Sequence, residues 1–163
     1  MNKAEAIALL EELFEKAEVQ DRLVIDQILK GIEKKLTVPD NSYIGCLLSA
    51  EKAVSKDSCT ITIPISSLVH NNLNIVHGGI IATLADSAMG ILANEVLETG
   101  YAAVTTQLNT HYLAPGNGES LSCTARFLHK GSKTMVLEAE VFREDGKKAA
   151  FATGSFFVVP ANK

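Results

Sequence analysis

The residues whose types and spacing best suit a chemical role are His77, Gly78 and Gly79. They stand at the start of a long apolar stretch with the spacing of a helix. The first turn of a helix leaves backbone N–H groups without intrahelical partners, and these groups carry the positive end of the helix dipole. Glycine lets another molecule approach the backbone closely, so Gly78 and Gly79 can offer an N–H to an oxyanion that develops on a carbonyl. The alternative for the pair alone is steric, with glycines placed where a helix and a sheet pack tightly.

Asp86 adds a carboxylate on the same helical face, seven residues beyond Gly79. A lone carboxylate among apolar residues is costly to bury without partners, and carboxylates kept at this cost are often functional. The alternatives are a carboxylate neutralised by hydrogen bonds or one that faces a subunit interface. The helical neighbours of Asp86 are mostly small, which leaves room for a substrate atom and a water: Ala82, Thr83, Met89 and Gly90, with Ala93 nearby.

The histidines give less information. His77 can orient a substrate carbonyl, serve as a general base or hydrogen-bond its own loop, and no partner near it in the sequence fixes its tautomer. The other three lack metal-ligand spacing: His70, His111 and His129. There is no Gly-x-Ser-x-Gly segment and no Cys/His pairing that indicates a nucleophilic serine or cysteine.

Composition narrows the classes of partner. The 163 residues include 15 Lys and Arg against 19 Asp and Glu, a net charge of −4, which argues against broad nucleic-acid binding. The odd number of cysteines, with no Cys-x-x-Cys pair, predicts neither a zinc site nor a disulfide framework, and free thiols suit a reducing cytoplasm. Residues 1–7 lack the basic start of a signal peptide, and residues 80–97 are too short and too polar for a membrane span. We expect a cytoplasmic protein without membrane, metal or cofactor.

The elements that must position these residues fall into two parts. Residues 1–36 carry apolar side chains at helical spacing and predict two amphipathic helices, with Asp21 as a candidate cap for the second. Residues 39–42, Pro-Asp-Asn-Ser, end this pattern with turn chemistry. We therefore expect an N-terminal helical extension over residues 1–38 and a second domain over residues 39–163.

In the second part, residues 60–63 alternate as a half-buried strand does, and residues 69–76 indicate a loop. A helix from about Gly78 to Glu98 is apolar nearly all round, which is typical of a buried helix, and Gly100 is a plausible stop. Four strand-like runs separated by short turns follow: 102–113, 120–129, 133–143 and 147–159. Short turns favour an antiparallel sheet. The sequence therefore predicts an α+β fold, in which a curved antiparallel sheet wraps around one long central helix.

Residues 71–86 resemble the signature of the hotdog-fold acyl-CoA thioesterases of the phenylacetate-pathway, THEM-like and 4-hydroxybenzoyl-CoA thioesterase-like type. In that family His-Gly-Gly is followed by an acidic residue nine positions after the histidine, as in His77 and Asp86. The resemblance continues through residues 104–115, where Asn109, Tyr112 and Pro115 fit the family's next strand. It covers residues 43–159 and leaves the N-terminal helices outside.

The resemblance implies hydrolysis of an acyl-CoA, with the coenzyme A thioester as substrate. Asp86 would be the general base or the nucleophile, and the Gly78 N–H would polarise the thioester carbonyl. Asn71 matches a loop amide that holds the water or the carbonyl, and His77 would sit beside the thioester. Thr105 matches a strand hydroxyl that orients the water, while Thr106 points to the opposite sheet face, so a register slip would exchange the two.

The resemblance also implies assembly and coenzyme A contacts. The active site would form across a dimer, with Asp86 and Gly78 from different protomers, and two dimers would pair into a tetramer. The turn over residues 129–134 matches the family's coenzyme A phosphate contact, and its cations and backbone N–H groups suit a phosphate. The candidate ligands are Lys130, Gly131, Ser132 and Lys133, together with Gly79 at the helix. The alternative is an ordinary solvated hairpin turn.

Two other functions fit the same fold. A non-catalytic acyl-CoA sensor would use residues 1–36 as a DNA-binding segment, but two acidic helices are short for that purpose. A hydratase or dehydratase would need a different arrangement of acid and histidine.

Overall fold

The computed structural model describes residues 1–38 and 41–161, so the predicted turn residues Pro39 and Asp40 lie outside the described part. The chain divides into two compact units, residues 1–49 with 66–68, and residues 50–65 with 69 onward. The helical unit therefore runs beyond the predicted boundary at residue 38, and it takes in a short segment that precedes the His-Gly-Gly loop.

The helical unit confirms the two predicted helices, α1 (Lys3–Lys16) and α2 (Val19–Thr37), and adds a short helix, α3 (Tyr43–Leu47). The residue that caps α2 is Glu18 rather than Asp21. Asp21 has the complementary role, since its carboxylate accepts the Glu18 backbone N–H at 3.3 Å. Gly31 is buried where α2 meets α3, and a Cβ there would lie 2.9 Å from the Leu47 Cα, so glycine is what allows this close packing.

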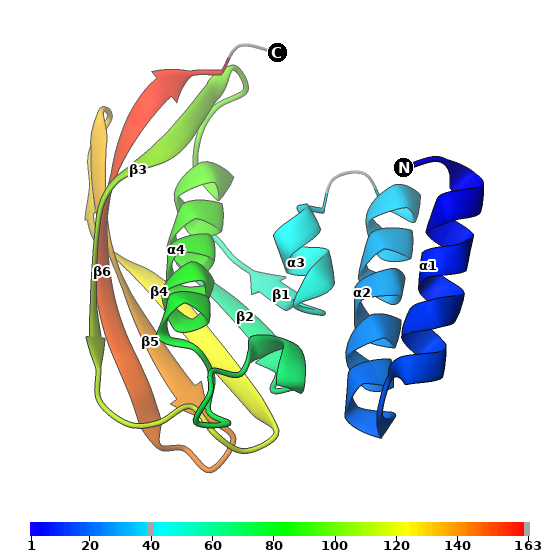
Figure 1. The fold of residues 1–163 in the computed structure, drawn as a ribbon. Helices are drawn as coiled ribbons and strands as arrows, with labels where there is room; N and C mark the ends of the chain where they lie inside the picture. The colour runs from blue at the N-terminus through cyan, green and yellow to red at the C-terminus, as the bar shows by residue number, and fades with distance from the viewer. Residues whose placement is uncertain (39–40, 162–163) are drawn as a thin grey trace. The chain divides into compact units, whose positions relative to one another are not determined.

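The second unit is a six-stranded sheet packed on one helix, α4 (Gly78–Glu95). The strands are β1 (Glu51–Val54), β2 (Ser58–Pro64), β3 (Tyr101–Tyr112), β4 (Ser120–Lys130), β5 (Thr134–Arg143) and β6 (Lys148–Pro160). Every neighbouring pair is antiparallel, in the order β1-β2-β4-β5-β6-β3. The sheet bends around α4 (Figure 1), which confirms the predicted α+β arrangement. A short 3-10 helix, η1 (Ser67–Val69), leads toward α4.

The core lies between α4 and the concave face of the sheet. Seven α4 side chains are buried there: Ile81, Leu84, Ala85, Ala88, Met89, Leu92 and Ala93. Alternate residues of β2, β4 and β5 meet them, as the period of two predicts. Burial of α4 is one-sided, however, because a single sheet covers only one side of a helix. The other side, with Ile80, Asp86 and Gly90, is half-buried.

Strand β3 is the long edge of the sheet. It pairs only with β6, and most of its residues are exposed. Val104 is 45% exposed and Leu108 is 37% exposed, although both are apolar. A long edge strand with uncovered apolar side chains offers its free backbone groups to another strand. The pairing with β6 shifts register between Thr105 and Gln107, which marks a β-bulge at Thr106.

Candidate active site

His77 caps α4 with its own side chain. Its Nδ1 accepts the Gly79 backbone N–H at 2.9 Å, and its backbone, at φ −59° and ψ 133°, is extended rather than helical. The expectation that no sequence-local partner fixes this imidazole was therefore wrong, since the partner lies two residues away. An accepting Nδ1 is unprotonated, which assigns the ring proton of the neutral imidazole to Nε2. The cap also occupies Gly79, so its N–H is not available to a ligand.

The backbone N–H of Gly78, unlike that of Gly79, is not used by the His77 cap. Within residues 1–38 and 41–161, the Gly78 N–H has no hydrogen-bond partner. Its carbonyl accepts the Tyr112 hydroxyl at 2.9 Å. Gly78 lies at a cavity of about 400 Å³ between the His-Gly-Gly loop and the end of β3. The lining residues are Asn71, Ile75, Val76, Gly78, Ile81, Tyr112, Leu113, Ala114, Pro115 and Gly116.

Asn71 belongs to the same cavity and holds its loop in shape. Its Oδ1 accepts the Leu73 N–H at 2.8 Å and lies 3.4 Å from the Ile75 N–H. Its backbone N–H donates to the Ile75 carbonyl at 2.8 Å, and Asn74 takes a left-handed φ of 56° to close the turn. The side-chain carbonyl is therefore used structurally. The Nδ2 amino group, which has no partner within the described part of the chain, remains as a donor beside Gly78.

Asp86 lies on the open side of α4, and Thr105 of β3 donates its hydroxyl to the Asp86 Oδ1 at 2.9 Å. The contact selects Thr105 over Thr106, whose hydroxyl donates instead to the Ser155 carbonyl at 3.1 Å. Asp86 is half-buried in the single chain and has Thr105 as a hydrogen-bond partner, so its carboxylate is not buried without a partner. One Asp86 oxygen is held by Thr105, and the other has no hydrogen-bond partner in the described part of the chain.

The expected stripe of small residues beside Asp86 is only partly present. Ala82, Thr83 and Gly90 are half-buried on its side of α4, but Met89 and Ala93 are fully buried against the sheet. Helical neighbours at three or four residues spread over more than one face, and the sequence alone did not show which of them the sheet would cover.

Three polar contacts tie the open side of α4 to β3 along its length. Tyr112 bonds Gly78 and Thr105 bonds Asp86. Asn94 completes the set, because its amide accepts the Ala103 N–H at 2.9 Å and donates to the Ala103 carbonyl at 3.3 Å. Sequence reasoning missed Asn94 and gave Tyr112 no role, although a second polar side chain eight residues after Asp86 in an apolar helix was a detectable signal.

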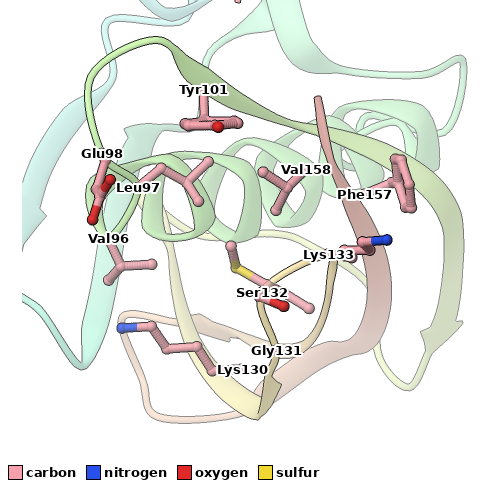
Figure 2. Close-up of a pocket in the computed structure, with 11 residues that line it drawn as sticks. Val96, Leu97, Glu98, Tyr101, Lys130, Gly131, Ser132, Lys133, Phe157 and Val158 are labelled. Atoms are coloured by element: carbon pink, nitrogen blue, oxygen red, sulfur yellow. The ribbon is translucent and has the colours of Figure 1, made fainter. Parts of the chain in front are cut away.

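The predicted coenzyme A turn borders a second cavity, at the other end of α4. It measures about 630 Å³ and has apolar walls from Val96, Leu97, Met135, Phe157 and Val158, with Glu98 and Tyr101 at its rim. Lys130 and Lys133 lie on the two sides of the turn (Figure 2). The expectation that Gly131 offers a free N–H was wrong, because that N–H donates to the Thr134 carbonyl at 3.0 Å and closes the hairpin. The remaining ligand groups are the two ammonium groups and Ser132.

The described residues offer neither a reactive cysteine nor a metal-binding cluster as an alternative to this site. Cys46, Cys59 and Cys123 are buried, and burial raises the pKa of the Cys123 thiol to about 12. A thiol with such a pKa is protonated at neutral pH and is a poor nucleophile. No cluster of three or more His, Cys, Asp or Glu side chains suited to a metal ion occurs in this part of the chain. None of the described helices is long and apolar enough to cross a membrane.

Comparison with known proteins gives one consistent family. Residues 73–150 match the model of the thioesterase superfamily. A crystal structure of the Bacillus halodurans BH2602 protein with CoA is 37% identical, with a TM-score of 0.87, over 94% of this chain and 99% of that one. The Escherichia coli acyl-coenzyme A thioesterase PaaI is 30% identical over 95 residues, 58% of this chain and 66% of the relative.

A further relative, the putative esterase PA1618 of Pseudomonas aeruginosa, is 27% identical over 129 residues, 78% of this chain and 89% of the relative. The matched residues include α4, with Gly78 and Asp86, and the strands β3, β4 and β5. The chain therefore belongs to the thioesterase superfamily, and its fold is the hotdog fold of that superfamily.

Proposed function

We propose that this protein hydrolyses an acyl-coenzyme A thioester to a free acid and coenzyme A, at the open side of α4. Its class, a thioester hydrolase, follows from its family and from relatives such as PaaI. Coenzyme A as the thiol portion of the substrate is supported by the BH2602 structure, which is described with CoA. The observation that carries the mechanism is the unpartnered Gly78 N–H in the first turn of α4.

The Gly78 N–H acts as the oxyanion donor. The thioester carbonyl lies in the cavity beside Gly78, where the N–H and the α4 dipole stabilise negative charge on oxygen. The His77 cap makes this assignment selective, because it occupies Gly79 and leaves Gly78 as the donor. The Asn71 amino group donates to the same carbonyl or to the attacking water. The His77 Nε2–H lies beside the thioester and stabilises the leaving thiolate.

Asp86 supplies the other half of the chemistry. As a general base, its free oxygen takes a proton from water while the water oxygen attacks the carbonyl carbon, and the C–S bond then breaks to release coenzyme A. As a nucleophile, Asp86 forms a mixed anhydride with the acyl group, expels the thiolate, and is freed by water. The Thr105 hydrogen bond holds Asp86 in one rotamer for either route.

One chain cannot supply both halves to one thioester. Gly78 and Asp86 are separated by eight residues of helix, which is about 12 Å along the axis at 1.5 Å per residue. A base and an oxyanion donor must both lie within about 3 Å of the reacting atoms. Each active site therefore combines Gly78 of one chain with Asp86 of a second. The exposed edge of β3 is where we expect two copies to pair into a dimer, and two dimers to associate into a tetramer.

We assign the nucleotide end of coenzyme A to the second cavity. Lys130 and Lys133 bring two positive charges to its rim, and Ser132 adds a hydroxyl. Phosphate groups fit this turn, and the apolar walls suit the remainder of the nucleotide. This cavity adjoins the C-terminal end of α4. The free thiols are consistent with a cytoplasmic location.

The test is a thiol-release assay with acyl-CoAs of increasing chain length and with aromatic acyl groups. We expect turnover of at least one, and a loss of about 10²-fold or more in kcat for Asp86→Asn, because the amide cannot accept the proton. Asp57→Asn, at an exposed turn between β1 and β2, is the matched control. Full activity of Asp86→Asn would show that another group is the base.

Mixed oligomers test the two-chain site. Chains with Asp86→Asn and chains with Gly78→Pro, which removes the N–H, should each keep about a hundredth of the wild-type activity or less when alone. Equal co-expression leaves one site in four intact by random pairing, so about a quarter of the wild-type activity should return. A mixture no more active than its parents would place both halves within one chain.

A further inference from the structure

We infer that Tyr112 is a positioning residue for the reaction: it holds Gly78 so that the unpartnered N–H points at the developing oxyanion. The inference rests on the proposed function and adds a residue to which that function gives no role. Its basis is a pair of contacts between one side chain and the residue that carries the donor.

The first contact is polar. The Tyr112 hydroxyl donates to the Gly78 carbonyl at 2.9 Å. Glycine is the residue with the greatest backbone freedom, and Gly78 opens the helix, where no preceding turn restrains it. The Gly78 carbonyl belongs to the peptide unit shared with Gly79, whereas the Gly78 N–H belongs to the unit shared with His77, whose carbonyl accepts the Ile80 N–H at 2.9 Å. The Tyr112 hydrogen bond holds the unit that follows the Gly78 Cα, so the two flanking peptide units together fix Gly78 and the direction of its N–H.

The second contact is steric. A Cβ on Gly78 would lie 3.3 Å from the Tyr112 Cζ and 3.4 Å from its Cε1 and its hydroxyl oxygen. The phenol ring therefore occupies the space where a side chain would otherwise stand. The ring packs directly against the first residue of the helix.

The chain before Gly78 is already anchored by its backbone. The His77 N–H donates to the Val69 carbonyl at 2.8 Å, and the Val76 N–H donates to the Gly116 carbonyl at 2.8 Å. The loop is thus fixed up to the cap residue. Among the described residues, Tyr112 provides the side-chain hydrogen bond to the carbonyl of Gly78.

The backbone of Tyr112 is itself held in place by its pairing with β6. It is the last residue of β3 and pairs with Ala150 of β6, and the next residue, Leu113, donates its N–H to the Ala149 carbonyl at 2.8 Å. Both alanines are fully buried. Tyr112 is 54% exposed, but its backbone is fixed by the pairing with β6. The hydroxyl therefore holds Gly78 at a fixed position relative to the sheet.

The proposal predicts a particular kinetic pattern. Tyr112→Phe keeps the ring and loses the hydroxyl. It should lower kcat about three- to tenfold with KM within twofold of wild type, because the donor acts on charge that exists only in the transition state. Thermal stability should stay close to wild type, since the lost bond lies at a partly exposed position.

The decisive test is a double-mutant cycle with Gly78→Pro, which has no N–H to position. Tyr112→Phe should lower kcat in the wild-type background and have no effect on the residual activity of Gly78→Pro. Tyr43→Phe, an exposed tyrosine of the helical unit, is the control and should leave kcat unchanged. An equal loss in both backgrounds, or no loss in either, would overturn the role of Tyr112.

A second readout does not depend on turnover. In a ¹⁵N–¹H spectrum, Tyr112→Phe should shift the Gly78 amide resonance and speed its hydrogen exchange, with Tyr43→Phe as the reference. An unmoved Gly78 amide would refute the positioning role even if the enzyme is active. A shifted amide in a protein that hydrolyses none of the acyl-CoAs would instead uphold the positioning contact and count against the proposed substrate.

Discussion

Removal of a single backbone N–H tests the oxyanion donor most directly. Gly78→Pro deletes that proton, and Gly78→Ala keeps it while adding a side-chain carbon at the same place. The pair therefore separates loss of the donor from crowding against Tyr112, which both variants share. Few oxyanion donors from the backbone can be deleted in this way, because proline usually disrupts the fold around them.

The structure makes proline acceptable at this position. Gly78 is the first residue of α4, where proline is favoured because that N–H has no intrahelical partner. The residue before a proline must be extended, and His77 already has φ −59° and ψ 133°. The added Cβ lies 3.3 Å from the Tyr112 ring, a contact that a shift of a few tenths of an ångström relieves. Both variants should fold.

The expected loss follows from what such donors contribute. Removing one oxyanion donor costs about 10²–10³-fold in kcat, roughly 2.7–4 kcal/mol of transition-state stabilisation. We therefore expect Gly78→Pro to fall by about 10²-fold or more below Gly78→Ala, whose own loss reflects only the contact with Tyr112. KM should change less than kcat, because the ground-state carbonyl makes a weaker hydrogen bond than the oxyanion.

The measurement is steady-state thiol release for wild type and both variants on the best acyl-CoA substrate, with circular dichroism and thermal melting to confirm folding. The reasoning fails if Gly78→Pro is folded and as active as Gly78→Ala. The Asn71 amino group or another N–H would then be the donor, and the His77 cap would have no bearing on the choice of donor.

Two further predictions concern regions away from the helix start. Lys130→Ala combined with Lys133→Ala should raise KM for acyl-CoA about tenfold or more with little change in kcat, and this difference in KM should shrink as the salt concentration rises. Lys147→Ala is the control. Equal KM values for the double variant and wild type would contradict the assignment of this turn to a phosphate. The backbone N–H groups of Glu119 and Ser120 donate hydrogen bonds to the Glu144 carboxylate and lower its pKa in the folded protein. The ionised carboxylate therefore stabilises the fold at pH values above its ordinary pKa of 4.5. This stabilisation is lost as the pH falls through the lower pKa of the folded protein. Glu144→Gln should therefore reduce stability to urea at pH 7 and match wild type in acid, and equal stability at pH 7 would contradict this.

Much of the second unit was predictable because its patterns are local. The helix that begins at Gly78 follows from an apolar run of helical length behind a glycine pair, and the hairpin between β5 and β6 from Asp145-Gly146, where Gly146 takes a positive φ of 80°. Helix α3 was missed because five residues are too few to show a period. The cap by His77 was missed because histidine is not among the usual capping residues, so the side chain was read only for its chemistry.

The residues of the site could be predicted better than their environments. Thr105 was matched to the acid from the resemblance, and the hydrogen bond to Asp86 agrees with that pairing. The half-buried state of Asp86 was not predictable, because burial depends on which side of α4 the sheet covers. The use of the Gly131 N–H inside its hairpin was hidden for a similar reason, since the partner carbonyl of Thr134 is set by turn geometry and not by residue type.

Strand β3 contacts the residues proposed for catalysis and also presents the edge at which a second chain can pair. Strand β3 carries Thr105 and Tyr112, and these residues set the position of Asp86 and of Gly78 on α4. The same strand presents the exposed edge at which a second chain can pair. Since the proposed donor and acid lie about 12 Å apart along one rigid helix, no change of rotamer brings them to one carbonyl. Pairing at β3 is the event that can bring the donor of one chain to the acid of another, so a separated chain would fold its core and hold two half-sites, neither able to hydrolyse a thioester.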